Sequence, residues 1–137
     1  MLKTCGIEIK GSTAIVVVLE GDTENFKVIP TEFKKINLEN SNNQKAVKSF
    51  YKVVSDFFKT NNFDKIGIKE RATKGKFSGG SATFKIEGLI QISDFPVVLV
   101  HGRTIKAKLK NKEIDCSEVN SYQAEAMRLA YCLMLEK

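Results

Sequence analysis

The stretch Thr4-Cys5-Gly6-Ile7-Glu8-Ile9-Lys10-Gly11 decides the fold, because it places an acid inside an apolar strand. A small fold normally has valine or isoleucine at a position such as Glu8. Burying an unpaired charge costs several kcal/mol, so this carboxylate must be paired, bound to a metal or placed at a cleft. Glu8 therefore marks a candidate site, although it does not name a reaction.

Two environments are open for the Glu8 side chain. Strand alternation places it on the same face as Thr4 and Gly6, whose small size is expected to leave room for a ligand. The alternative is a structural ion pair with a lysine such as Lys10 or Lys69, because structural pairs also perturb acids.

Composition narrows the class of protein. The 137 residues, 42% of them hydrophobic, predict one domain that covers residues 1–137 and has one core. The three cysteines form no Cys-x-x-Cys pair, which indicates reduced thiols. Neither a membrane span nor a signal-peptide pattern is evident, so we expect a cytoplasmic protein. The net charge of +6 favours an acidic partner such as nucleic acid, although a solvated basic surface is the commoner explanation.

The first half of the chain predicts three strands and a helix. Residues 3–10, 13–20 and 26–31 are apolar segments separated by short breaks with glycine, which is typical of an antiparallel meander. After polar residues 32–42, paired apolar residues recur at helical spacing as far as Phe58, with lysines on the opposite face. This helix is therefore expected to pack on the sheet through its aromatic stripe.

The second half alternates strands and helices. Residues 64–69 predict a strand parallel to the first, because a strand after a long helix usually returns through a right-handed crossover. Residues 81–91 fit both a strand and a helix, and we favour the helix. Residues 96–100 predict a buried strand, residues 101–112 a basic and partly extended segment, and residues 122–136 a helix.

This order of elements resembles the ribonuclease H-like fold, and over nearly the whole chain it looks most like the Holliday-junction resolvase (RuvC-like) branch. Three sequence segments carry the resemblance: Gly6-Ile7-Glu8-Ile9-Lys10-Gly11, Ile66-Gly67-Ile68-Lys69-Glu70-Arg71 and Tyr122-Gln123-Ala124-Glu125-Ala126. The chain is also similar to an uncharacterised bacterial family with a Lys-Gly-Lys-Phe-x-Gly-Gly loop, here Lys74-Gly75-Lys76-Phe77-Ser78-Gly79-Gly80. The resemblance implies an α/β, ribonuclease H-like fold: a five-stranded mixed sheet of order 3-2-1-4-5 with helices on both faces.

The resemblance also implies a magnesium site. Enzymes of the superfamily hold two Mg²⁺ ions with acids on the first strand, at the end of the fourth and at the start of the last helix; the matches are Glu8, Glu70 and Glu125. These three residues are the candidate catalytic and metal-binding set. From the residues alone, Glu70 is equally an exposed loop acid, and Glu125 an acid favoured by the dipole at a helix start.

A basic, glycine-rich loop is the candidate nucleic-acid-binding element. Backbone amides at a helix start bind phosphate, and an aromatic ring among cations can stack on a base. The alternative is a solvated loop. The candidate contact residues are Lys69, Arg71, Lys74, Lys76, Phe77, Gly79 and Gly80.

A second basic cluster alternates as on one strand face and either continues this surface or charges an edge strand; it comprises Arg103, Lys106, Lys108 and Lys110. His101, the only histidine, is expected to be a satisfied core or edge residue.

Three functions follow from these patterns. The first is a Mg²⁺-dependent nuclease that binds nucleic acid, and the second is a catalytically inactive binding or interaction module with the same fold. A nucleotide-binding or protein-interaction domain is the third, because a fold does not fix a function. The sequence leaves the oligomeric state open, with a homodimer among the options.

Overall fold

The computed structural model describes residues 1–70 and 80–135, which form a mixed sheet flanked by helices. The strands are β1 (Leu2–Lys10), β2 (Thr13–Gly21), β3 (Phe26–Val28), β4 (Lys35–Asn37), β5 (Lys65–Lys69) and β6 (Val97–Val100). The helices are α1 (Gln44–Asn61), α2 (Ser81–Gln91), α3 (Gly102–Lys108) and α4 (Ala124–Leu135), and a 3-10 turn (Ser121–Gln123) leads into α4.

The sheet has the strand order predicted from the resemblance. Its order is β3-β2-β1-β5-β6, which is the predicted 3-2-1-4-5 once β4 is set aside. The pair β1–β2 is antiparallel, whereas β1–β5 and β5–β6 are parallel. Gly11, at φ 58°, lies in the two-residue turn between the paired ends Lys10 and Thr13, where a left-handed backbone favours glycine.

Strand β4 was not predicted from the sequence. It pairs antiparallel with β2 and buries the Ile36 side chain under α1, in the same apolar cluster as Phe50. Three residues with one apolar position give no alternation to detect, so the polar composition of residues 32–42 concealed this strand.

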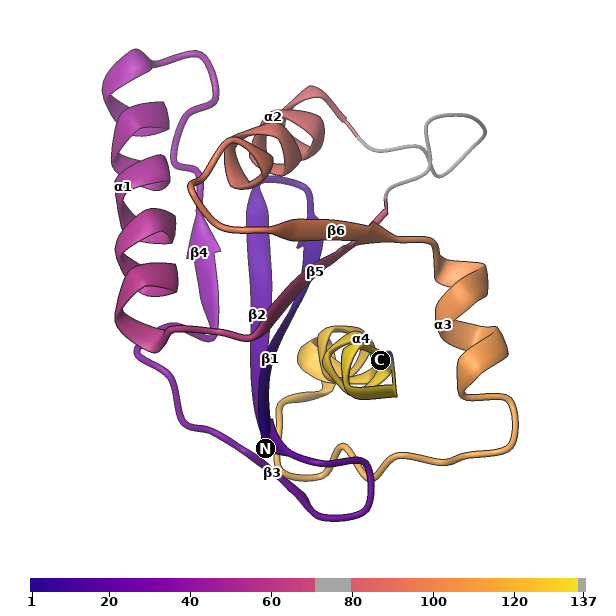
Figure 1. Cartoon of the computed structure of the whole chain (residues 1–137). Coiled ribbons are helices and arrows are strands. Elements are labelled where there is room, and N and C mark those ends of the chain that lie inside the picture. Colours follow the sequence, from indigo (N-terminus) through magenta and orange to yellow (C-terminus); the bar gives the residue numbers. More distant parts are fainter. Residues whose placement is uncertain (71–79, 136–137) are drawn as a thin grey trace.

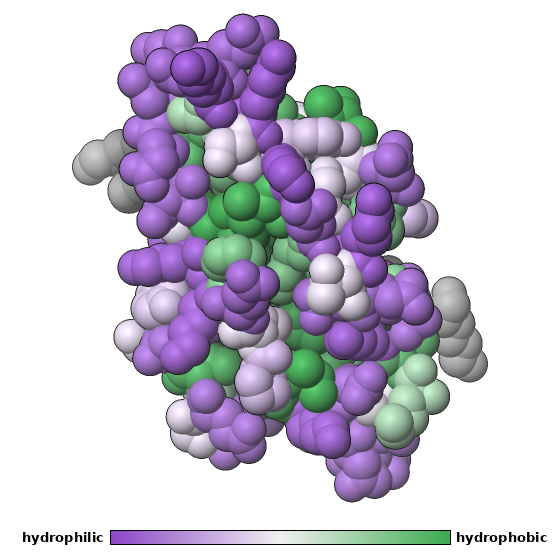
Figure 2. Space-filling view, turned by 90° about the vertical axis from the view of Figure 1, so that its left-hand side faces the viewer, coloured by the Kyte–Doolittle hydropathy of each residue, from purple (hydrophilic) through white to green (hydrophobic). Residues whose placement is uncertain are grey.

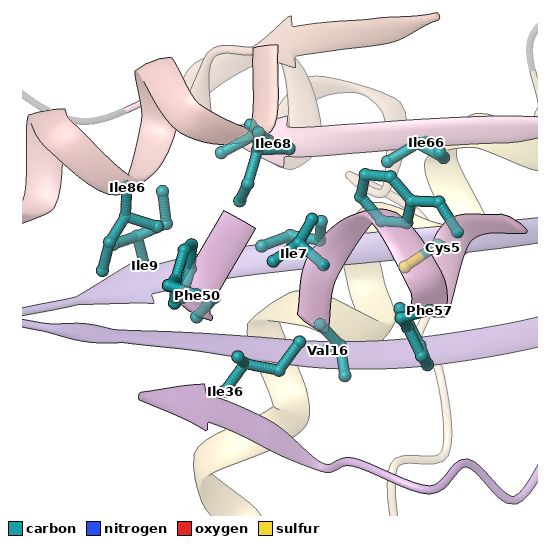
Figure 3. Packing of buried hydrophobic residues seen from close by; sticks show 14 of the residues in the cluster. Cys5, Ile7, Ile9, Val16, Ile36, Phe50, Phe57, Ile66, Ile68 and Ile86 are labelled. Atoms are coloured by element: carbon teal, nitrogen blue, oxygen red, sulfur yellow. The ribbon is translucent and has the colours of Figure 1, made fainter. Parts of the chain in front are cut away.

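The two faces of β1 meet different helices. Cys5, Ile7 and Ile9 pack into the apolar cluster under α1 and α2, which Figure 3 shows from close by. The alternate residues Thr4 and Gly6 face α4: the Thr4 hydroxyl donates to the Ala130 carbonyl oxygen at 2.8 Å. Figure 1 accordingly shows α1 and α2 on one side of the sheet and α3 and α4 on the other.

Helix α1 follows the predicted amphipathic pattern. The Asn43 side chain caps it by accepting from the Ala46 backbone N–H, and the buried face includes Phe50, Phe57 and Phe58. Hydrophilic residues cover most of the molecular surface on the α1 side, with apolar residues between them (Figure 2). The aromatic stripe therefore anchors α1 to the sheet, as the sequence predicted.

Two predictions for the region after residue 95 were wrong. The strand predicted to be buried, β6, lies at the edge of the sheet. Val98 and Leu99 are therefore exposed, and Val100 is the one buried residue of this strand. Residues 102–108 form α3 rather than an extended segment, because Ile105 packs against α4 with half-buried Leu109 one turn later. The four basic residues interpreted from the sequence as one strand face, Arg103, Lys106, Lys108 and Lys110, are thus spread around a helix and its C-terminal turn.

Within residues 1–70 and 80–135, none of the helices combines the length and apolar character that crossing a bilayer requires.

Candidate functional site

Glu8 is buried at the centre of the sheet and faces two lysines. Its side chain is 5% exposed, with Oε1 3.7 Å from Lys10 Nζ and Oε2 3.8 Å from Lys69 Nζ. These distances exceed those of a charge-assisted hydrogen bond, so the attraction is mainly coulombic. Among the described residues, Oε1 has no hydrogen-bond partner. The structural pairing with Lys10 or Lys69 that the sequence left open is present with both lysines.

Strand register explains why Lys69 reaches Glu8. In the parallel pair β1–β5, Ile7 lies beside Ile68, so the next position brings Lys69 beside Glu8. The Lys69 ammonium continues to α4 and donates to Glu125 Oε2 at 3.0 Å. Lys69 thereby links carboxylates that come from the two ends of the chain.

Glu125 lies in the first turn of α4 and binds two cations. Besides Lys69, the Arg128 guanidinium donates from one nitrogen to Glu125 Oε1 at 2.7 Å. Burial raises the pKa of the Glu125 carboxyl, but the hydrogen bonds and charges of Lys69 and Arg128 outweigh it and hold the pKa below 4.5. The sequence analysis did not predict the ion pair between Arg128 and Glu125, although their i,i+3 spacing was a detectable signal.

Glu70 is placed apart from the other two acids. Its side chain is exposed, and its backbone N–H extends the β5–β6 ladder by donating to the Val100 carbonyl oxygen at 2.9 Å. Alternation places Glu70 on the face of Ile66 and Ile68, the opposite face from Lys69. No contact found among the described residues joins Glu70 to Glu8 or Glu125.

The space that the small residues of β1 were expected to leave for a ligand is occupied by α4. A Cβ atom at Gly6 would lie 2.1 Å from the Ala126 carbonyl oxygen and 2.7 Å from the Ala130 nitrogen. The small side chains therefore admit the helix backbone. This close packing brings Glu125 within reach of Lys69.

A pocket adjoins the acids between α3 and α4, where the segment after α3 crosses below them in Figure 1. Its volume is about 460 Å³, within the range of ligand pockets. Apolar side chains and cations line it together with two acids: Ile105, Leu109, Ile114, Lys106, Lys112, Arg128, Glu113 and Glu125. Glu125 and Arg128 line the pocket and also belong to the cluster of acids and cations around Lys69. The pocket and this cluster are therefore continuous.

Most of the predicted nucleic-acid-binding loop lies outside the described residues. These positions are Arg71, Lys74, Lys76, Phe77 and Gly79. Gly80 precedes α2 in extended conformation, at φ −79° and ψ 176°. The role of the loop stays a prediction.

His101 caps a helix, and the cysteines are free thiols. His101 is exposed after β6 and caps α3, with Nδ1 accepting from the Arg103 backbone N–H at 3.1 Å. The three cysteines are free thiols, as expected, and burial raises the pKa of Cys5 and Cys116.

A family model covers nearly the whole chain. It is described as a protein of unknown function (DUF3010) and matches residues 2–133. The chain belongs to this family. No curated protein matches the sequence.

Holliday-junction resolvases are among the solved structures that this chain resembles. Thermus thermophilus RuvC superposes with a TM-score of 0.72 at 13% identity, over 95% of this chain and 92% of that chain. T. thermophilus RuvC in complex with Holliday junction substrate gives 0.68 at 13% identity, over 96% and 91%. The fowlpox virus Holliday junction resolvase gives 0.54 at 13% identity, over 98% and 99%. This DUF3010 chain therefore has the ribonuclease H-like fold of the resolvases.

The acids of this fold do not fit a magnesium centre as they are arranged here. Each of the four oxygens of Glu8 and Glu125 has a lysine or arginine nitrogen between 2.7 and 3.8 Å away. Mg²⁺ requires oxygen ligands at near-octahedral positions, and these ammonium and guanidinium groups would repel it. Within residues 1–70 and 80–135, no group of three or more His, Cys, Asp or Glu residues is placed to hold a metal.

Proposed function

We propose that this protein binds nucleic acid, with branched DNA as its ligand class, through the surface where β1 and β5 end and α4 begins. The observation that carries the proposal is the charge of the site. Three cations, Lys10, Lys69 and Arg128, surround the carboxylates Glu8 and Glu125, so the cluster has a net positive charge. A positive cluster attracts phosphate.

The pocket extends this basic surface. Lys106 and Lys112 line it beside Arg128, and the Lys112 ammonium is held 3.1 Å from the Tyr131 hydroxyl. Cations fixed by neighbouring groups bind phosphates at a smaller entropic cost than free lysines. The fold supports the same partner, since T. thermophilus RuvC and the fowlpox virus resolvase were both solved with Holliday junction DNA.

A Mg²⁺-dependent nuclease is the competing hypothesis, with Glu8, Glu70 and Glu125 as its acids. The feature in its favour is the buried Glu8 Oε1, which has no hydrogen-bond partner among the described residues. This function requires Lys69 to leave both carboxylates. The ion pairs of Lys69 therefore favour a binding module over a nuclease.

One experiment separates the two functions. Fluorescence anisotropy should show that a labelled four-way junction binds in EDTA, and more tightly than a duplex of the same arm sequence. A denaturing gel of the same samples with Mg²⁺ or Mn²⁺ should show intact strands.

Cleavage that Glu8→Gln abolishes would establish the nuclease instead. Failure to bind any nucleic acid at about 50 mM salt, where charge-driven binding is strong, would exclude both functions.

A further inference from the structure

Lys69 lies between the carboxylates of Glu8 and Glu125, where a positive charge offsets their mutual repulsion. Its Nζ atom is 3.8 Å from Glu8 Oε2 and 3.0 Å from Glu125 Oε2. The lysine side chain is 25% exposed and Glu8 is 5% exposed, so solvent screens their attraction only partly.

The backbone fixes this lysine. The parallel register of β5 on β1 places the Lys69 backbone beside Glu8, and the first turn of α4 provides the second acid, Glu125. The stem passes beside Gly102, where a Cβ atom would be in ordinary van der Waals contact with Lys69 Cε at 3.5 Å. A compact ammonium with three donors suits a gap between two carboxylates better than a planar guanidinium does.

We propose that Lys69 is a built-in counter-ion that takes the place of a divalent metal ion between Glu8 and Glu125. The native site then requires no metal and takes none. The proposal concerns the charge of the site, and it is independent of whether nucleic acid is the partner.

A buried acid with no counter-charge is strongly destabilising, so Lys69 stabilises the fold as long as Glu8 is charged. The flanking cations do not replace it. Lys10 lies at the other Glu8 oxygen and is 57% exposed, and Arg128 contacts Glu125 through a different oxygen. Lys69 is the only cation that contacts both acids among the described residues.

The first test is a double-mutant cycle between Lys69 and Glu8. Lys69→Gln should lower the melting temperature of the wild type. The same change should cost clearly less in a Glu8→Gln background, where it removes only the ion pair with Glu125. Lys10→Gln is the matched control, because it removes an exposed partner of the same acid and should cost less. Equal effects of Lys69→Gln in the two backgrounds would overturn the counter-ion role.

The second test uses Mn²⁺ and Mg²⁺ alone as probes, with thermal unfolding as the readout. The wild type should show no metal-dependent stabilisation that Glu8→Gln removes. Lys69→Glu adds a third carboxylate on the same face, so its melting temperature should rise by roughly 5–10 °C at a metal concentration about 100 times the Kd. The additional change Glu8→Gln should abolish this rise.

A wild-type protein that Mn²⁺ stabilises through Glu8 would overturn the proposal, even if Lys69→Glu fails to fold. A folded Lys69→Glu variant that gains no response to metal would also contradict it. Neither measurement involves nucleic acid, so these outcomes are separate from a failure of the proposed binding function.

Discussion

Glu8 shows how a central strand can accommodate a charge without a direct hydrogen bond to either counter-ion. Its ammonium partners at 3.7 and 3.8 Å act over a distance at which coulombic attraction is strong only where water is scarce. Glu125, by contrast, holds its partners at 2.7 and 3.0 Å near the surface. Lys69 contacts both acids, so a change in the charge of one carboxylate affects the other through this lysine.

The lowered pKa of Glu125 predicts how the stability of the protein depends on pH. Because the folded-state pKa is depressed, the stabilisation is present above the ordinary value of 4.5 and is lost as the pH falls through the folded pKa. Glu125→Gln should therefore lower the free energy of unfolding at neutral pH by about 1 kcal/mol, a modest amount for a partly exposed network. This difference should shrink in acid.

Urea unfolding of both proteins across this pH range provides the measurement. Glu113→Gln, which changes an exposed acid that lines the same pocket, is the control. A Glu125→Gln difference that stays constant with pH would show that the ion pairs do not stabilise the fold.

The sequence singled out Glu8 and offered Lys69 as one possible partner. It did not determine that Lys69 rather than Glu70 shares the face of Glu8, because that depends on a one-residue register between strands far apart in sequence. The link to Glu125 was beyond sequence reasoning for a similar reason, since the packing of α4 on β1 brings the two residues together.

At the scale of elements, the contact between β1 and α4 determines the geometry of the site. Gly6 lies against the backbone of α4 at Ala126 and Ala130, and the Thr4 hydroxyl fixes the same turn. Small residues on both sides permit this close approach. A shift of α4 would move Glu125 away from Lys69.

Gly6→Ala should therefore be strongly destabilising. The new Cβ atom would lie 2.1 Å from a backbone carbonyl oxygen, which no side-chain rotation can relieve. We expect a loss of at least about 3 kcal/mol in the free energy of unfolding, measured by urea denaturation.

Gly88→Ala is the matched control, because nothing lies within 4 Å of its Cβ position in α2. This change should raise stability by about 0.5–1 kcal/mol through helix propensity. Equal effects at the two glycines would contradict the close packing of α4 on β1.

Elements with long periodic patterns were predictable, whereas two short ones, β4 and α3, were not. The apolar spacing of α1 and the alternation of β1 extend over enough residues to identify each element. In α3, the decisive interaction is the burial of Ile105 against α4, a tertiary contact that the interpretation of the basic residues as one strand face left out. The exposure of β6 follows from its edge position, which the order of elements suggested but the Val97–Val100 sequence concealed.

At the scale of the whole molecule, two separate surfaces among the described residues each carry several lysines. One is the outer face of α1, where Lys45, Lys48, Lys52 and Lys59 are exposed. The other surrounds α3 and α4, next to the acids linked by Lys69. Net charge alone does not distinguish these surfaces as binding sites, and a shared fold does not either.

Removal of charge from each surface in turn distinguishes them. Lys106→Gln with Lys112→Gln should weaken binding of the four-way junction and lower the slope of log affinity against log salt by about two, because each lysine on a phosphate contributes about one. Glutamine at position 112 retains a donor for the Tyr131 hydroxyl, so the fold should be preserved.

The control changes two exposed lysines of α1, Lys45→Gln with Lys48→Gln, and removes the same charge from the opposite side of the sheet. Its salt slope should match that of the wild type, because long-range attraction is screened within about 10 Å at 0.1 M salt. Equal losses for the two pairs would mean that DNA responds to net charge alone. A loss confined to the α1 pair would move the binding surface to the other face and separate it from Glu8, Lys69 and Glu125.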